Sequence, residues 1–399
     1  MPSRYRFNRL EVSGSLGDLG TLLPISIGLI LVNGLNPTGL FLSVGFLYVF
    51  SGLYYGVPVP VQPMKAIGAY SIAMSMSALQ ITASGFLMGA TLLIIGATGT
   101  ITFIGRYIPK SVVRGVQLST GTLLMIQGIK FMLGTSQLQA LSRAAEPYLN
   151  IGDIGIIPIG LVIGAVGGIL TLLLLENKQV PAALIVISGG LVLGLIFGTR
   201  EGFTDLTIGF NLPKLLPFGW PSGTDFSFAV FALVLPQMPM TLGNATIAYA
   251  DLSTEYFGEQ SKKVTYRASC ITMAIANFVS SLIGGMPLCH GAGGLAAHYR
   301  FGARTPGSNL IIGLLFILLA ILLGQQSLTL IYLLPMSVLG ILLAFSGSQL
   351  ALTIVDLRGR KDLFTVVMIL GITLASNLGA GFVAGIAISY VLRSDKLQV

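Results

Sequence analysis

Charged residues are scarce in this chain, because only 9% of its 399 residues are Asp, Glu, Lys or Arg. A soluble domain of ordinary composition carries about 25% of them. Hydrophobic residues make up 54% of the sequence, and the mean hydropathy is +0.87. The shortage of charge therefore excludes an ordinary soluble protein and indicates a chain with several membrane spans.

Cysteine and histidine are equally rare, with two residues of each. Cys270 and Cys289 lie in or near apolar runs without metal-site spacing, so neither a disulfide framework nor thiol redox chemistry is expected. His290 and His298 also lack the spacing of a metal site. The sequence has no HExxH motif, nucleophile elbow or paired carboxylates. We therefore expect neither an enzyme nor a bound cofactor or metal.

Acidic residues are fewer than basic ones, and the net charge is +8. The basic residues fall in short loops between apolar runs, which is typical of membrane proteins. No stripe of basic and aromatic residues indicates nucleic-acid binding. The N-terminus also lacks the short apolar core and cleavage site of a signal peptide. Membrane lipid is thus an expected partner and nucleic acid is not.

Long apolar runs are what the sequence has in abundance. Twelve have about the length of a membrane-spanning helix, and they lie near 13–33, 37–56, 82–104, 112–133, 156–175, 180–198, 226–248, 267–285, 308–324, 328–347, 362–376 and 379–393. Two shorter, interrupted segments near 60–79 and 287–299 complete fourteen. The sequence predicts an all-α membrane protein with two sets of seven segments.

The basic residues test this topology. With the N-terminus in the cytoplasm, seventeen of the 22 Lys and Arg residues fall on the cytoplasmic side. Only Arg143, Arg200 and Lys214 fall outside, and Lys65 and Lys130 lie within spans. Such an asymmetry favours cytoplasmic N- and C-termini in a plasma-membrane protein.

The hydrophilic stretches 134–155, 199–225 and 249–266 are each too short for an independent core. The stretch 199–225, with its three prolines, is the natural connector between the first half, 1–198, and the second half, 226–399. We expect no cytoplasmic regulatory domain.

Proline-containing breaks interrupt the apolar pattern once in each half. They read PVPVQPMK at 58–65 and MPLCHGAGG at 286–294, and Pro60 and Pro287 are 227 residues apart. The motif SLGD at 15–18 precedes the similar TLGN at 241–244 by 226 residues. Two nearly equal offsets, with seven segments in each half, predict an inverted repeat.

The breaks also predict a ligand site. Proline prevents a helix from continuing, so we expect short half-helices to start near Met64 and Gly291. Free N–H groups at two such helix starts would bind an anion. Gly291, Gly293 and Gly294 would let the backbone approach the ligand closely.

Polar side chains at the breaks are candidate ligands. They are Gln62, Lys65 and His290. Lys65 either helps to hold an anion or forms an ion pair with Asp18. His290 either donates to an oxyanion or is a satisfied packing residue.

Asp18 is the only acidic residue well inside a span, so it either couples transport to protons or serves as a structural partner. Thr21 follows Asp18 by one helical turn. Gln237, Thr241 and Asn244 occupy the matching segment of the second half. Each of these four neutral residues either contacts the ligand or forms hydrogen bonds between helices.

The segments PVPVQPMKAI and PLCHGAGGLAAHYRFGART resemble the two signature motifs of the molybdate transporter family related to sulfate permeases, and GSLGDLGTLLP at 14–24 resembles its first span. The resemblance covers essentially the whole chain. It implies the fold shared by sulfate permeases and nucleobase symporters, in which a core domain moves against a gate domain, often within a homodimer.

The domains implied by the resemblance are a core of 13–104 with 226–324 and a gate of 112–198 with 328–393. The anion would bind between the half-helices of segments 3 and 10, with contacts from segments 1 and 8. This arrangement predicts a secondary transporter that imports molybdate by alternating access. Sulfate, tungstate or another oxyanion remains the main alternative; a nucleobase symporter and an anion channel are weaker ones.

Overall fold

The computed structural model describes residues 5–101, 108–151, 153, 155, 157–175, 177, 181–199, 203 and 206–393. The predicted positions Arg200 and 102–104 lie outside these residues. The described chain is predominantly helical, as expected for an all-α protein, and its one sheet has two short strands.

Most helices of the first half follow the predicted segments, and the short α8 lies in the predicted hydrophilic stretch 134–155. They are α1 (Arg9–Ser15), α2 (Leu19–Asn33), α3 (Pro37–Tyr55), α4 (Lys65–Ala73), α5 (Ala78–Thr98), α7 (Lys110–Leu133), α8 (Gln137–Ser142), α9 (Ile159–Leu174) and α10 (Ala182–Phe197). The first predicted span, 13–33, is bent, because α1 and α2 meet at 42°. Asp18 lies in that break and is the N-cap residue of α2.

The second half begins with a long continuous helix, Gly223–Ser261. Its α-helical parts α11 (Gly223–Ala229), α12 (Leu235–Met240) and α13 (Tyr249–Phe257) are joined by the π-helical segments η1 (Val230–Val234) and η2 (Thr241–Ala248). The prediction that 249–266 is a loop is therefore wrong for most of that stretch. The amphipathic run YADLSTEYF continues the helix beyond the apolar residues used to place its end.

The remaining helices of the second half are α14 (Tyr266–Leu282), α15 (Ala292–Arg300), α16 (Gly307–Leu323), α17 (Ser327–Ile331), α18 (Met336–Ala351), α19 (Arg360–Ala375) and α20 (Leu378–Val391). The single predicted span 328–347 is in fact two helices. Pro335 is the N-cap of α18 and has no N–H to continue α17.

Within the described residues, five helices are long and apolar enough to cross a membrane, and the bent pair α1–α2 makes a sixth. The helices α9, α10 and α20 are equally apolar but shorter. Side chains on α9 such as Leu172 and Leu173 are 63% and 77% exposed. An apolar exterior of this kind is stable against lipid and not against water.

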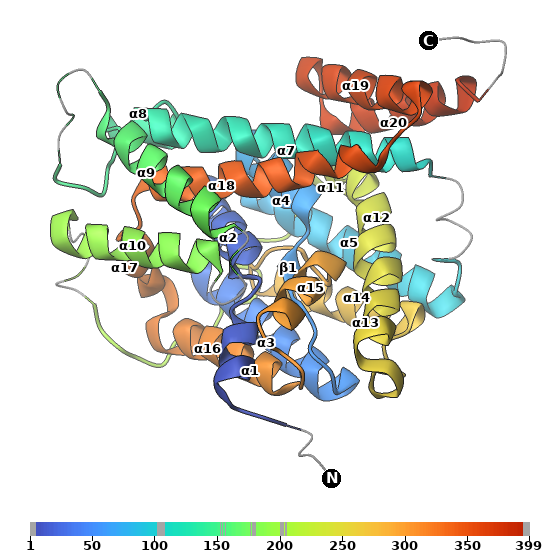
Figure 1. Cartoon of the computed structure of the whole chain (residues 1–399), viewed down its shortest axis with the longest axis horizontal. Helices are drawn as coiled ribbons and strands as arrows, with labels where there is room; N and C mark the ends of the chain where they lie inside the picture. The colour runs from blue at the N-terminus through green and yellow to red at the C-terminus, as the bar shows by residue number, and fades with distance from the viewer. Residues whose placement is uncertain are drawn as a thin grey trace.

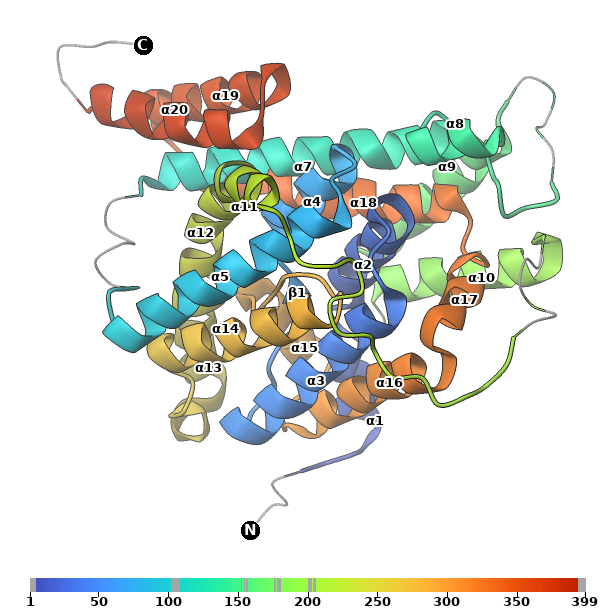
Figure 2. The same cartoon turned by 180° about the vertical axis from the view of Figure 1, so that it is seen from behind.

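Figures 1 and 2 show two layers of helices. The long helices α7 and α18 run side by side across one layer together with α9, α10, α19 and α20, and the other helices form the body beneath. Glycines allow α7 and α18 to pack closely: a Cβ on Gly128 would lie 2.3 Å from the carbonyl oxygen of Gly340. The contact is reciprocal, since a Cβ on Gly340 would lie 2.5 Å from the carbonyl oxygen of Gly128. In the body, α3 packs on α16 and α5 on α14.

The two breaks meet as the only sheet of the described residues. Strands β1 (Gln62–Pro63) and β2 (Leu288–Cys289) pair antiparallel, with Gln62 opposite Cys289. The N–H of Met64 extends the pairing by donating to the carbonyl oxygen of Pro287 at 2.9 Å. All of these residues are buried. The extended segments thus satisfy each other's backbone groups in the middle of the protein.

A buried carboxylate fixes the start of α18. Glu146, in the loop before α9, is only 5% exposed. Its Oε2 and Oε1 accept hydrogen bonds of 2.8 Å from the backbone N–H groups of Met336 and Ser337, respectively. These N–H groups lie in the first turn of α18, where a helix has no internal acceptors for them. Glu146 therefore connects the loop between α8 and α9 to α18, the helix that packs along α7.

Glu146→Ala is expected to lower the free energy of unfolding by about 1–3 kcal/mol, because it leaves two buried N–H groups without acceptors. Thermal unfolding of the purified chain in detergent measures this. Glu255→Ala, at an exposed position, is the control. Equal melting temperatures for the two variants would contradict the capping role.

The same carboxylate should make the stability of the folded protein depend on pH. Burial raises the pKa of Glu146 above its ordinary value of 4.5. A raised pKa in the folded state means that the contribution of this group to stability is full below pH 4.5 and is lost as the pH rises through the folded value. The stability of the wild type relative to Glu146→Gln should therefore fall as the pH rises above 4.5. Parallel profiles of melting temperature against pH would exclude this titration.

Candidate functional site

The two breaks are followed by short helices that begin next to the sheet. The helix α4 begins at Lys65 with Met64 as its N-cap, and α15 begins at Ala292 with Gly291 as its N-cap. Neither cap residue forms a side-chain capping bond. The first N–H groups of both helices must therefore find partners elsewhere or remain available to a ligand.

The side chain of Gln237 in α12 accepts hydrogen bonds from backbone N–H groups of α4. Its Oε1 accepts from the backbone N–H groups of Ala66 at 2.8 Å and Ile67 at 3.3 Å. Its Nε2 donates to Thr241 Oγ1 at 2.9 Å. Gln237 therefore connects α12 to α4, which was one of the two roles predicted for it, whereas Thr241 pairs with Gln237 within the same continuous helix. No comparable side-chain acceptor is found for the start of α15 within the described residues.

A cavity of about 370 Å³ lies beside these helix starts. It brings together four of the predicted site residues: Thr21 of α2, Lys65 of α4, Asn244 of η2 and Gly293 of α15. Lys65 is the only charged residue among the described residues that line it. The cavity therefore combines one cation with neutral hydrogen-bonding groups, a lining that favours a small anion.

The opposite wall of the cavity comes from the other layer of helices. Its polar residues were not predicted, and they are Gln117 of α7, Thr171 of α9, Ser346 and Gln349 of α18, and Thr353 after α18. None of these residues lies beside a proline-containing break of the kind used to predict the site. Only the amides of Gln117 and Gln349 within long helices carried a signal that sequence reasoning could have used.

Asp18 and Gln62 lie behind the cavity wall. Gln62 Nε2 donates to Asp18 Oδ1 at 2.8 Å. Gln62 is 1% exposed and Asp18 is 4% exposed. Asp18 Oδ2 and Gln62 Oε1 have no hydrogen-bond partner among the described residues. Both side chains approach the backbone of α15, because a Cβ on Gly294 would lie 2.5 Å from Asp18 Oδ2 and 2.8 Å from Gln62 Nε2.

The predicted alternative of an ion pair between Lys65 and Asp18 is not formed. Neither of the ion pairs within the described part of the chain involves these residues. Asp18 instead has Gln62 as its side-chain partner, and Lys65 faces the cavity.

His290 is not among the residues that line this cavity. Its Nδ1 lies 3.0 Å from the carbonyl oxygen of Pro60, and its Nε2 lies 3.1 Å from Thr272 Oγ1. The ring is fully buried between Tyr55 and Tyr249, with centroids 6.0 and 5.2 Å away. Both nitrogens are thus used by the protein, which is the packing role that the sequence left open.

Met64 and Gly291 also lie outside the cavity lining. The Met64 side chain is buried in an apolar cluster. Gly291 lies against Gln62, since a Cβ at Gly291 would be 2.2 Å from Gln62 Oε1. The small residue is required there by close packing of the two breaks, not by direct contact with the cavity.

A metal site is not found in the described residues, which contain no group of three or more His, Cys, Asp or Glu side chains placed to hold an ion.

The chain is similar to known proteins over most of its length. The family model "Molybdate transporter of MFS superfamily" matches residues 10–124 and 229–350. Molybdate transporter 2 of Arabidopsis thaliana is 32% identical over 97% of this chain and 88% of its own length.

Two solved structures share the fold. SLC26A9 gives a TM-score of 0.66 at 14% identity, over 96% of this chain and 65% of that one. The transmembrane domain of the cyanobacterial bicarbonate transporter BicA gives a TM-score of 0.64 at 13% identity, over 96% of this chain and 98% of that domain.

Proposed function

The chain belongs to the molybdate transporter family, and from this premise we propose that it imports molybdate across the plasma membrane as a secondary active transporter. It is an integral membrane transporter and not an enzyme. The observation that carries the proposal is the cavity in which Lys65 is the only charged group among the described lining residues.

The charge of molybdate, a tetrahedral dianion, is offset from two sources. Lys65 supplies a positive charge at the cavity wall. The start of α15 supplies unpaired N–H groups and the positive end of the helix dipole, where anions are stabilised by up to about 2 kcal/mol. Thr21 and Asn244 add a hydroxyl and an amide that donate to oxyanion oxygens. At Gly293 a side chain is absent, so the ion can approach the backbone.

Sulfate and tungstate are the nearest alternatives, because they have the same shape and charge as molybdate. Uptake of labelled molybdate into proteoliposomes, measured with excess sulfate, tungstate or neither, separates them. A molybdate transporter should retain most of its uptake in excess sulfate. Complete inhibition by the excess sulfate would assign sulfate as the substrate, and an uptake rate that does not saturate with molybdate would indicate a channel.

An inverted repeat accounts for the paired helix starts. The helices α4 and α15 both have nine residues, and their first residues are 227 positions apart, as are Pro60 and Pro287. The antiparallel pairing of β1 with β2 supports a two-fold relation between the halves. We assign 13–104 and 226–324 to a core and 112–198 and 328–393 to a gate.

Alternating access then means that the core moves against the gate. The cavity lies between them and is lined by Leu175, Ala182 and Thr353 at ends of gate segments. Cytoplasmic termini would place these three residues on the cytoplasmic side. With this orientation we propose an inward-facing state, in which Ser346 Oγ of the gate donates to the carbonyl oxygen of Gly20 of the core at 3.2 Å.

Asp18 is the candidate for coupling transport to protons. Asp18→Asn should still bind molybdate, since its side chain is outside the cavity lining, but uptake should no longer respond to an imposed pH gradient. The measurement is uptake into proteoliposomes under separate pH and sodium gradients, with binding followed by calorimetry. If Asp18→Asn keeps the full response to the pH gradient, Asp18 is a structural partner of Gln62 alone.

A further inference from the structure

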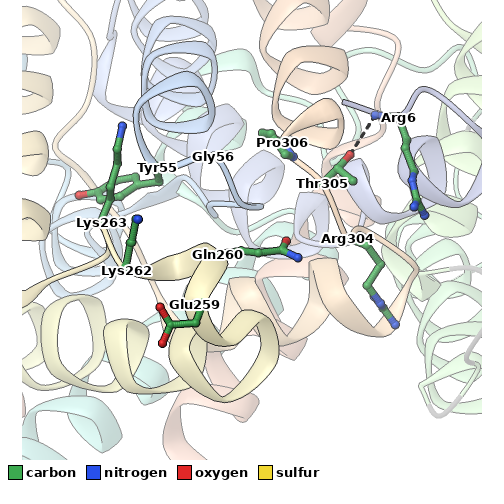
Figure 3. Close-up of a pocket in the computed structure, with 10 residues that line it drawn as sticks. All are labelled: Arg6, Tyr55, Gly56, Glu259, Gln260, Lys262, Lys263, Arg304, Thr305 and Pro306. Carbon is green, nitrogen blue, oxygen red and sulfur yellow. Dashed lines mark hydrogen bonds between the residues drawn. The ribbon is translucent and has the colours of Figure 1, made fainter. Parts of the chain in front are cut away.

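A second cavity, of about 450 Å³, lies apart from the proposed transport site (Figure 3). Four segments form it: the arm before α1, the end of α3, η3 (Gly258–Ser261) with the turn that follows it, and the loop between α15 and α16. It shares no lining residue with the cavity beside Lys65. The topology predicted from the charges places all four segments on the cytoplasmic side.

Positive charge dominates this second cavity. Its lining contains Arg6, Lys262, Lys263 and Arg304 but one carboxylate, Glu259. None of these five side chains takes part in an ion pair within the described residues. In Figure 3 the two lysines lie on one side of the cavity and the two arginines on the other, with Gln260 between them. The lining of this cavity therefore carries four cations against one carboxylate.

Part of this arrangement is fixed before any ligand binds. The guanidinium of Arg304 lies over the ring of Tyr299 at 3.5 Å and donates to the carbonyl oxygen of Ala303 at 2.8 Å. The backbone N–H of Arg6 donates to Thr305 Oγ1 at 3.2 Å, which holds the N-terminal arm against the α15–α16 loop. A fixed arginine loses less side-chain entropy on binding than a free one.

We propose that this cavity binds a phosphate-bearing anion with at least two negative charges. Arginine and lysine together are the usual ligands of phosphate groups. A volume of about 450 Å³ is in the range of pockets for whole small molecules, so a bare oxyanion would leave most of it unfilled. At the cytoplasmic surface the same chemistry is offered by the headgroup of an anionic lipid and by a soluble polyphosphate.

Binding there would act on the elements that carry the transport site. The α15–α16 loop is held to α1 by Glu11, whose carboxylate accepts from the N–H groups of Arg304 at 3.1 Å and Thr305 at 2.9 Å. A ligand that bridges Arg6 and Arg304 would reinforce this contact. It would therefore stabilise the relative position of α1, which precedes Asp18, and of α15, which contains Gly293.

The test uses the purified full-length chain and two probes, tripolyphosphate and cardiolipin, with phosphatidylcholine as the uncharged-headgroup reference. We expect saturable binding of at least one charged probe. The double substitution Lys262→Gln with Lys263→Gln should weaken it roughly thirtyfold, since each lysine near a lipid surface contributes about fivefold. The probe that binds more tightly identifies the source as soluble or lipid.

The matched control is Arg360→Gln with Lys361→Gln, which removes the same charge from a different basic cavity on the gate. The affinity of this control should stay within about twofold of the wild type, because charges farther than a Debye length are screened. Equal losses in the two double variants, or no saturable binding of either charged probe, would overturn the proposal. Because binding is measured without transport, the result does not depend on the identity of the transported ion.

Discussion

Lys65→Ala is expected to abolish measurable molybdate uptake. Lys65 is the only charged residue among the described residues of the transport cavity, so no neighbouring cation there can replace it. Removing one partner of a buried charge pair, here Lys65 from its pair with molybdate, typically costs about 2–5 kcal/mol. The dissociation constant for molybdate should therefore increase by a factor between about 30 and several thousand. An effect on binding of this size would leave the cavity empty at the low concentrations at which a trace oxyanion is imported.

Calorimetric titration of molybdate and uptake into proteoliposomes measure the two parts of this effect. Lys65→Met keeps most of the apolar stem, so it separates the loss of charge from a loss of packing. Lys130→Ala is the matched control, because Lys130 lies exposed near the end of α7. Unchanged affinity in Lys65→Met, with a normal melting temperature, would remove Lys65 from the site.

Gly294→Ala is expected to have the second largest effect. A methyl group at this position would lie 2.5 Å from Asp18 Oδ2, 2.7 Å from Pro60 Cβ and 2.8 Å from Gln62 Nε2. All three atoms belong to buried residues of the break and of segment 1. Overpacking of this kind costs about 1–3 kcal/mol. It must separate α15 from Asp18 and Gln62, so uptake should fall at least tenfold and the melting temperature should drop.

The adjacent Gly293→Ala is an unusually close control. A methyl group at Gly293 meets no atom within 4 Å, and Gly293 and Gly294 belong to the same turn of α15. Gly293→Ala should keep the wild-type melting temperature. A loss of molybdate affinity in this variant would indicate that the backbone at Gly293 contacts the ion. If both variants melt alike, the close approach of Gly294 to Asp18 is not important for folding.

The sequence predicted the helix starts because prolines and glycines act locally. Starts near Met64 and Gly291 were expected, and α4 and α15 begin at Lys65 and Ala292. The family was also predicted correctly from its two signature motifs, and the family model confirms it. These features depend on a few adjacent residues, so no knowledge of tertiary contacts was needed.

The composition of the site was harder to predict, because it depends on which side chains meet across the fold. Gln237 and His290 had the right chemistry for ligands, yet α4 and Thr272 use their polar atoms. Gln117 and Gln349 were overlooked, although both line the cavity. Glu146 was expected in a loop, and nothing local indicated that α18 would bury it. The sequence shows which side chains can donate or accept hydrogen bonds, but it does not show which of them pair in the folded protein.

The hydrogen bonds between β1 and β2 have a consequence for the direction of transport. They join α4 and α15 into one unit, so an ion held between the two helix starts would meet the same donors when the core faces either side of the membrane. Its dissociation constants on the two sides would then be nearly equal. A carrier of this kind transports equally well in both directions, so the gradients alone set the direction of net flux. Vesicles loaded with molybdate should therefore release it as readily as empty vesicles take it up.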